Sequence, residues 1–209
     1  MKRMFISILL FAPSFMFAQL GVKAGLNFAN VTNANEINSS TETGYHFGLF
    51  LQGPVKKFLS SDTELLYSKQ GYNYETSENT GNVNLHYLVL HQFLVLNFTK
   101  FVQVQAGGQI AYLLNAKVDS TEVSTGNSSV DNILDVLNRF DYGLSGGVEV
   151  HPLDMIVAGM RVNFSLGQLY KVPEPGEEVP AFYPDVDAKN NLFQVYVGIK
   201  FVKKEEESQ

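Results

Sequence analysis

The chain has 209 residues, of which 45% are hydrophobic and none is cysteine, and its formal net charge is −6. The lack of cysteine excludes disulfides, thiolate metal sites and cysteine nucleophiles. An acidic chain offers no basic face for nucleic acid, so we expect no nucleic-acid partner. Its 16 Phe, 10 Tyr and 17 Gly favour strands, because aromatic residues suit a pleated surface and glycines allow bends and close approach.

The first 18 residues have the pattern of a signal peptide. Lys2 and Arg3 form a basic start, an apolar stretch runs over 4–17, and Ala18 is a small residue at a plausible cleavage point. The apolar stretch is shorter than the roughly 20 residues of a membrane-spanning helix. We therefore expect 1–18 to be a cleaved signal peptide that directs the protein out of the cytoplasm.

After residue 18, apolar residues alternate with polar residues or glycine, which is typical of strands with one apolar face. Between Gln19 and Phe28, for example, every even position is apolar. The predicted strands cover 19–28, 44–53, 62–75, 84–98, 100–114, 139–151, 155–167 and 192–201.

The connections between these strands alternate between long and short, as in outer-membrane barrels with short periplasmic turns and longer extracellular loops. A closed barrel is the only arrangement of strands that satisfies every backbone group within a membrane. We predict an all-β protein: a closed antiparallel transmembrane β-barrel of about eight strands over 19–201, followed by a polar tail over 202–209. The predicted location is the cell outer membrane.

The glycine-rich strand faces carry isolated charges, whereas the apolar faces carry almost none. In an outer membrane the apolar face contacts lipid and the polar face lines the lumen. The interior of an eight-stranded barrel is just wide enough for side chains to fill it. We predict that these charges form a salt-bridged cluster in the lumen, and the alternative is that they line a water-filled conduit. The residues are Lys23, Glu64, Asp141, Glu149, Arg161 and Lys200.

A series of short glycine- and aromatic-rich motifs runs along the whole chain after residue 18. They are Gly21–Phe28, Glu64–Gly71, Tyr87–Leu90, Gln105–Gly108, Tyr112–Leu114, Asp141–Gly143 and the closing strand to Phe201. In their order and spacing they resemble the PorT-like outer-membrane β-barrel proteins of Bacteroidota. The resemblance implies a barrel fold and an outer-membrane location, and one namesake of the family is linked to a protein secretion system. The chain departs from the family pattern at Val89 and His91, where the family has an acidic residue and a proline.

Two motifs could indicate chemistry. Gly143–Gly147 matches the G-x-S-x-G pattern of a serine nucleophile, but that pattern needs a strand-to-helix turn and here it lies in a predicted strand. His86 and His91 are five residues apart, so on a strand they face opposite sides and cannot share a metal. We expect no catalytic residue, no metal and no cofactor.

The sequence therefore predicts a non-enzymatic outer-membrane barrel with a structural or interaction role through its extracellular loops. The alternatives are a narrow porin-like channel for ions or small solutes and an accessory component of a protein secretion system. A membrane-embedded enzyme is disfavoured because no catalytic set is visible. The expected partners are outer-membrane lipid, lipopolysaccharide and the barrel-assembly machinery, together with an envelope protein that the sequence does not identify.

Overall fold

The computed structural model describes residues 19–32, 38–75, 80–120, 134, 136–172 and 188–201. The predicted signal peptide, 1–18, and the predicted polar tail, 202–209, lie outside these ranges. Within them, no helix has the length and the hydropathy that crossing a membrane requires.

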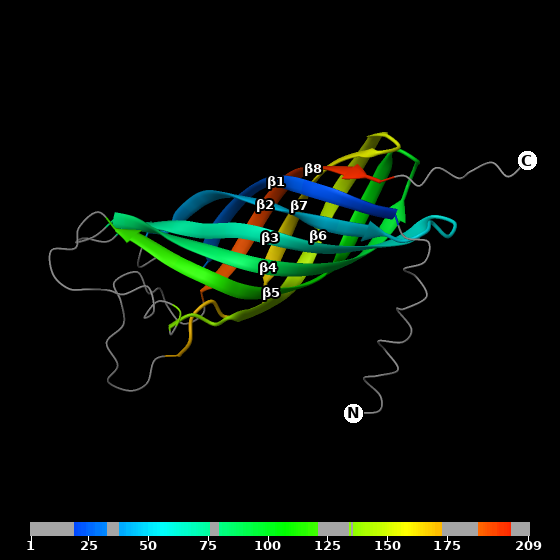
Figure 1. The fold of residues 1–209 in the computed structure, drawn as a ribbon. Coiled ribbons are helices and arrows are strands. Elements are labelled where there is room, and N and C mark those ends of the chain that lie inside the picture. Colours follow the sequence, from blue (N-terminus) through cyan, green and yellow to red (C-terminus); the bar gives the residue numbers. More distant parts are fainter. Residues whose placement is uncertain are drawn as a thin grey trace, which may run out of the picture.

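Eight strands form one closed barrel in which each strand pairs antiparallel with its neighbour in sequence (Figure 1). β8 pairs with β1 from Gly21 opposite Lys200 to Thr32 opposite Lys189, and this pairing closes the barrel. The predicted fold class is confirmed. The strands are β1 (Gln19–Thr32), β2 (Ser40–Gln52), β3 (Leu59–Glu75), β4 (Thr80–Asn97), β5 (Val102–Ser120), β6 (Phe140–Leu153), β7 (Ile156–Ser165) and β8 (Lys189–Lys200).

β4 and β5 are longer than predicted. β4 begins at Thr80 rather than at 84, and β5 continues to Ser120 rather than stopping at 114. These extra residues pair with one another, but the register between the two strands shifts between His86 and Tyr87. A bulge of this kind breaks the alternation of polar and apolar positions, so the pattern in the sequence stops short of the real strand ends.

The two ends of the barrel differ in their connections. The turn end carries the short connections 53–58, 98–101 and 154–155, together with the start of β1 and the end of β8 (Figure 1, right). At the loop end the connections 33–39, 121–139 and 166–188 are longer, but 76–79 is as short as a turn-end connection, contrary to the predicted alternation, because β4 begins at Thr80 rather than at 84. There β3, β4 and β5 reach furthest from the barrel centre (Figure 1, left).

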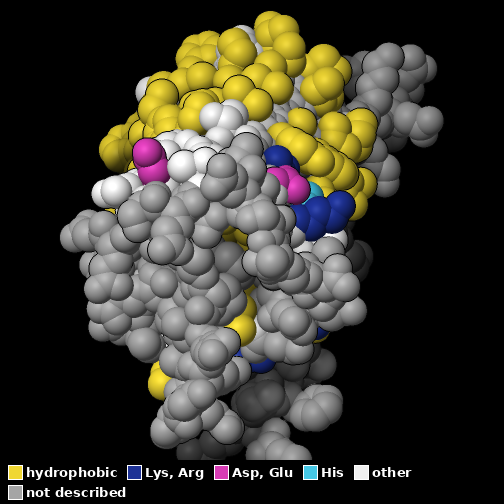
Figure 2. All heavy atoms as spheres, turned by 90° about the vertical axis from the view of Figure 1, so that its left-hand side faces the viewer, with side chains coloured by type: hydrophobic (Ala, Val, Ile, Leu, Met, Phe, Trp, Pro, Cys, Tyr) yellow, Lys and Arg dark blue, Asp and Glu magenta, His cyan; other side chains and the backbone are white. Residues whose placement is uncertain are grey.

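The outer wall of the barrel is apolar. Val197 is 62% exposed and Leu94 is 54% exposed, whereas inward-facing Lys23 is 2% exposed and Glu64 is fully buried. Figure 2 looks onto the loop end and shows hydrophobic side chains over the outer wall, with the visible charged side chains at its rim. The face that carries the glycines and charges is therefore the inner one, as the sequence predicts.

Aromatic side chains gather near both ends of this apolar wall. The exposed aromatic residues towards the loop end include Tyr45, Tyr112, Phe140, Tyr142 and Phe164, and those at the turn end are Phe58, Phe98, Phe101 and Phe201. Two such girdles flanking an apolar band are a feature of outer-membrane barrels, where the rings lie at the level of the lipid headgroups.

Candidate functional site: the filled lumen

The centre of the lumen contains a buried ion cluster that joins strands far apart in the chain. The Lys23 ammonium of β1 donates hydrogen bonds to Glu64 of β3 and, at 3.1 Å, to Glu149 of β6. Asp62, one inward position from Glu64 towards the turn end, lies 3.9 Å from the same ammonium. Because Lys23 and Glu64 have no exposed side-chain area, each charge depends on the other for the stabilisation that water would otherwise give.

Arg161 of β7 completes the cluster from the other side of Glu64. Its Nη1 donates to Glu64 Oε2 at 2.6 Å, and its Nε donates to the side-chain oxygen of Gln194 at 2.6 Å. The guanidinium also lies over the rings of Phe93 and Tyr196, at 5.4 and 5.0 Å from their centroids. A planar cation suits both a carboxylate and an aromatic face, so Glu64 is shared between two fully buried cations.

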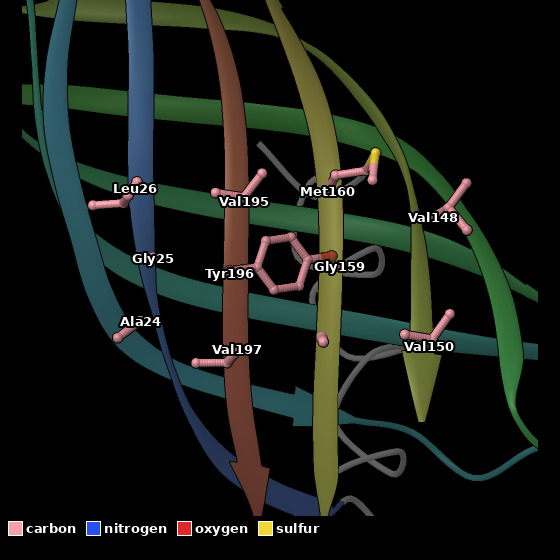
Figure 3. Close-up of a pocket in the computed structure, with 11 residues that line it drawn as sticks. Ala24, Gly25, Leu26, Val148, Val150, Gly159, Met160, Val195, Tyr196 and Val197 are labelled. Atoms are coloured by element: carbon pink, nitrogen blue, oxygen red, sulfur yellow. The ribbon is translucent and has the colours of Figure 1, made fainter. Parts of the chain in front are cut away.

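Tyr196 of β8 contacts both cations and acids of the cluster. Its hydroxyl donates to Glu149 at 3.2 Å and accepts a hydrogen bond from Gln105, and the Lys23 ammonium lies 4.3 Å from its ring centroid. Figure 3 shows the ring lying across the gap from β8 to β7, beside Gly159. A Cβ at Gly159 would come within 2.6 Å of the ring, so only glycine leaves room for Tyr196 in this position.

Small residues also shape the outer wall behind this ring. Ala24 of β1 and Ala158 of β7 both lie opposite Val197 of β8, and Gly25 and Gly159 both lie opposite Tyr196. The result is an apolar depression of about 420 Å³ across β1, β8, β7 and β6.

A layer of amides and hydroxyls lies next to the ion cluster, on its loop-end side. The Asn27 side-chain oxygen accepts hydrogen bonds from Gln194 and from His46 Nδ1, both at 2.7 Å, and its nitrogen donates to Ser68 at 2.9 Å. The Gln194 oxygen also accepts from Asn163 at 3.0 Å. Every one of these side chains is buried, so the layer depends on mutual hydrogen bonding, because an unpaired buried polar group is costly.

The loop-end half of the lumen is filled mainly by apolar and aromatic side chains. Leu85, Leu113 and Leu137 have no exposed area there, and the Tyr72 and Tyr170 hydroxyls are hydrogen-bonded to each other. Leu137 also forms a β-bridge with Tyr170, so residues from two loop-end connections pack on this core. The buried members of the core are Val31, Tyr72, Tyr74, Val83, Leu85, Tyr87, Val89, Ala111, Leu113, Ala116, Leu137, Leu169, Tyr170 and Ala188.

Of the residues predicted to form one lumen cluster, Lys23, Glu64, Glu149 and Arg161 meet, but Asp141 and Lys200 lie elsewhere. Asp141 accepts a hydrogen bond from Ser165 at 2.5 Å near the loop end. It faces inward like Glu149, but eight positions along β6 separate the two by about 27 Å. Lys200 lies at the turn end, where it donates to Gln52 at 2.8 Å. The cluster is therefore smaller than predicted, because a shared face does not imply a shared height in the barrel.

The sequence analysis missed other members of the lumen. Asp62 has the same parity as Glu64 in β3 and is 2% exposed, so the alternation could have identified it. His91 and His151 also point inward, at 3.9 Å from Glu64 and 3.0 Å from Glu149. Histidine is compatible with either a metal site or a hydrogen-bonded lumen, and its residue type alone does not distinguish the two.

The motifs with possible chemistry lie in ordinary strand positions. Ser145 is buried within β6 and donates a hydrogen bond to Gln109 at 3.2 Å. His86 lies on the outer face and is hydrogen-bonded to the Tyr67 hydroxyl at 2.7 Å, whereas His91 faces inward. In the part of the chain that the structure describes, no group of three or more histidine and acidic side chains is placed to hold a metal ion.

An eight-stranded closed barrel with an apolar outer wall, two aromatic girdles and charged side chains buried inside is typical of the class of outer-membrane β-barrel proteins. The family model described as "Outer membrane protein beta-barrel domain" matches residues 14–171, so the chain belongs to this family and is an outer-membrane protein. No curated protein matches the sequence.

Solved structures with the same fold are distant in sequence. Neisserial surface protein A is 14% identical with a TM-score of 0.51, and the match covers 87% of this chain and 97% of that one. Ail of Yersinia pestis is 13% identical with a TM-score of 0.46, covering 89% and 100%. OprG of Pseudomonas aeruginosa is 11% identical with a TM-score of 0.46, covering 90% and 97%. At this level of identity the similarity concerns the fold alone.

Proposed function

We propose that the protein is a closed, non-enzymatic barrel that acts through its surfaces rather than by conducting solutes. The observation that carries this proposal is the complete burial of the Lys23, Glu64 and Arg161 side chains where they meet in the centre of the lumen. A continuous water-filled path would leave at least one of these groups exposed. Unpaired charges cost several kcal/mol when they are dehydrated, and the mutual pairing of these groups removes that cost without water.

The loop-end half supports the same proposal. A packed core that includes Leu85, Leu113 and Leu137 fills this half mainly with apolar side chains, which cannot replace the hydration shell of a passing ion. Two barriers of different chemistry, one charged and dry and one apolar, therefore lie in series along the axis. The strand position of Ser145 supports the non-enzymatic part of the proposal, because a nucleophile in a strand is not lifted out of the sheet.

On this proposal, the loop end is the part of the barrel that interacts with partners. Outer-membrane barrels have short periplasmic turns and longer extracellular loops, so on this proposal the loop end faces outward and the turn end faces the periplasm. Lipopolysaccharide and outer-membrane lipid surround the apolar wall, and the barrel-assembly machinery inserts it. The resemblance to PorT-like proteins adds an envelope protein of a secretion system as a proposed partner. Cross-linked envelopes followed by purification of the full chain would identify such a partner.

Two measurements test the closed lumen: conductance in planar bilayers and the stability of the variant Arg161→Ala. We expect the wild-type protein to show no steady conductance in planar bilayers. Arg161→Ala removes one of the two cations on Glu64 and is expected to lower the free energy of unfolding by about 3 kcal/mol, measured as the heat-induced shift in gel mobility. Arg139→Ala is the matched control, because Arg139 is exposed at the loop end, and it should change neither property.

A channel would give the opposite result. Water in the lumen would solvate Glu64 after loss of Arg161, so stability would hold while the reversal potential moved towards cation selectivity. Steady wild-type conductance, or that combination in Arg161→Ala, would refute the closed barrel in favour of a narrow pore.

A further inference from the structure

The turn end of the barrel contains a polar cavity of about 530 Å³ that the closed lumen does not explain. The short connections 53–58 and 98–101 and Asp154 border it, and the inward-facing ends of β2, β5 and β8 form its floor. We call this cavity the vestibule. It lies outside the ion cluster, so an argument about it does not depend on whether the lumen conducts.

The vestibule has an excess of positive charge although the chain as a whole is acidic. Lys57, Lys100 and Lys200 line it, and the acid among the lining residues is Asp154. The deeper acids Asp62 and Glu149 are already engaged by Lys23, at 3.9 and 3.1 Å.

Lys200 is the buried member of this set. It is 6% exposed and donates a hydrogen bond to the Gln52 oxygen at 2.8 Å, yet no ion pair between described residues includes it. Gln52 in turn donates to the Gln103 oxygen at 3.1 Å. This chain of hydrogen bonds uses both glutamine oxygens as acceptors, so the floor of the vestibule presents N–H donors and a cation.

The two rim lysines are held by tight turns. Lys56 and Leu59 exchange backbone hydrogen bonds of 2.8 and 3.0 Å, and Lys57 within that turn has a φ of 60°. In the next turn, the Thr99 hydroxyl accepts hydrogen bonds from the backbone N–H groups of residues 101 and 102, both at 3.0 Å. The lysines therefore project from fixed backbone and need little ordering to face a common ligand.

From this arrangement we infer that the vestibule is a binding site for a phosphate group, with Lys57 and Lys100 at its rim and Lys200 with the Gln103 amide at its floor. Ammonium and amide donors with no excess of acceptors match a phosphate, which offers several acceptor oxygens and negative charge. The phosphate can belong to a soluble anion or to a lipid headgroup. The headgroup is within reach because Lys100 lies next to Phe101 of the turn-end girdle, 4.9 Å from its ring centroid.

Binding of inorganic phosphate tests the soluble source. The full chain is folded in a maltoside detergent, which carries no phosphate, and its unfolding temperature is measured with increasing phosphate against chloride at equal ionic strength. We expect phosphate to raise the unfolding temperature of the wild type. Each lysine removed is expected to weaken binding about fivefold, as for one solvated charge pair at about 4 Å.

The variants are Lys57→Gln with Lys100→Gln, and separately Lys200→Gln. Because Lys57 and Lys100 are exposed turn residues, the double variant is expected to fold even if Lys200→Gln does not. Lys56→Gln is the matched control, since it removes an adjacent turn lysine that does not line the vestibule. It should bind phosphate as the wild type does.

Native mass spectrometry tests the lipid source. After exposure to equal amounts of phosphatidylglycerol and phosphatidylcholine, the wild type and Lys56→Gln should retain phosphatidylglycerol preferentially, and the double variant should lose that preference. A response in either experiment that depends on Lys57 and Lys100 supports the site and identifies its source. No response in both, or an equal loss in Lys56→Gln, would overturn it.

Discussion

The two halves of the lumen are equally buried but are stabilised in different ways. In the centre, towards the turn end, Lys23 and Arg161 pair with the acids Glu64 and Glu149. The side chains of Lys23, Glu64 and Arg161 have no exposed area there. In the loop-end half, side chains such as Leu85 and Leu113 fill the same kind of space by volume alone. The barrel wall around both halves follows the same alternation.

Polarity inside this small barrel is therefore a local property and not a requirement of the fold. A charged cluster needs each member, because the loss of one leaves the others dehydrated and unpaired. An apolar core needs only volume, because its contacts are non-directional and its cost on truncation is that of a cavity. We therefore expect removal of a charge at constant volume to destabilise the central cluster, and removal of volume without a change of charge to destabilise the loop-end half.

The largest effect is expected from Glu64→Gln, which keeps the volume of the side chain and removes its charge. Glu64 is hydrogen-bonded to both Lys23 and Arg161, so the substitution removes the acid that pairs with buried Arg161 and one of the acids that pair with Lys23. We expect a loss of about 3–5 kcal/mol in the free energy of unfolding, measured by urea titration of the folded barrel in detergent.

Glu42→Gln is the control for that substitution. Glu42 pairs with Lys69 at 3.5 Å, and the Lys69 side chain is 25% exposed. Partly solvated pairs contribute about 0–1 kcal/mol. Equal losses in the two variants would show that the central cluster is not dehydrated.

A smaller effect is expected in the loop-end half, where volume decides. Leu85→Ala removes a fully buried side chain of the apolar core and should cost about 2–5 kcal/mol through the cavity it leaves. Leu85→Met conserves volume and should cost less than about 1.5 kcal/mol. Leu88→Ala, on the outer face of the same strand and 41% exposed, is the matched control, and lipid or detergent can fill the space it leaves. Urea titration would contradict this view of the loop-end half if Leu85→Met were as damaging as Leu85→Ala.

The smallest effect is expected in the amide layer between the two halves. Asn27→Ala removes a hydrogen-bond partner of His46, Gln194 and Ser68. These neutral groups can partly pair with one another, as Gln194 already approaches His46 Nδ1 at 3.3 Å. We expect a loss of about 1–3 kcal/mol, seen as a lower temperature of the mobility shift on gels. A loss as large as that of Glu64→Gln would place this layer within the charged cluster in energetic terms.

The strands and their faces can be predicted from the sequence alone. Alternation with a period of two is a property of neighbouring residues, so positions such as Lys23 and Val197 could be assigned to opposite faces without any knowledge of their partners. Counting the alternating segments predicted eight strands. The closed barrel was predicted because every backbone group in a membrane must be paired. The strand ends at the loop end were less predictable, since the register shift between His86 and Tyr87 interrupts the alternation.

Which inward residues contact one another depends on the tertiary structure. Lys23 contacts Glu64 across 41 residues and Glu149 across 126 residues of chain, and such contacts depend on the register of every strand pair between them. Asp141 shares a strand and a face with Glu149 but lies near the other end of the barrel, where it bonds to Ser165. Height along the axis is set by the accumulated stagger of the strands, and no local pattern of residues encodes it.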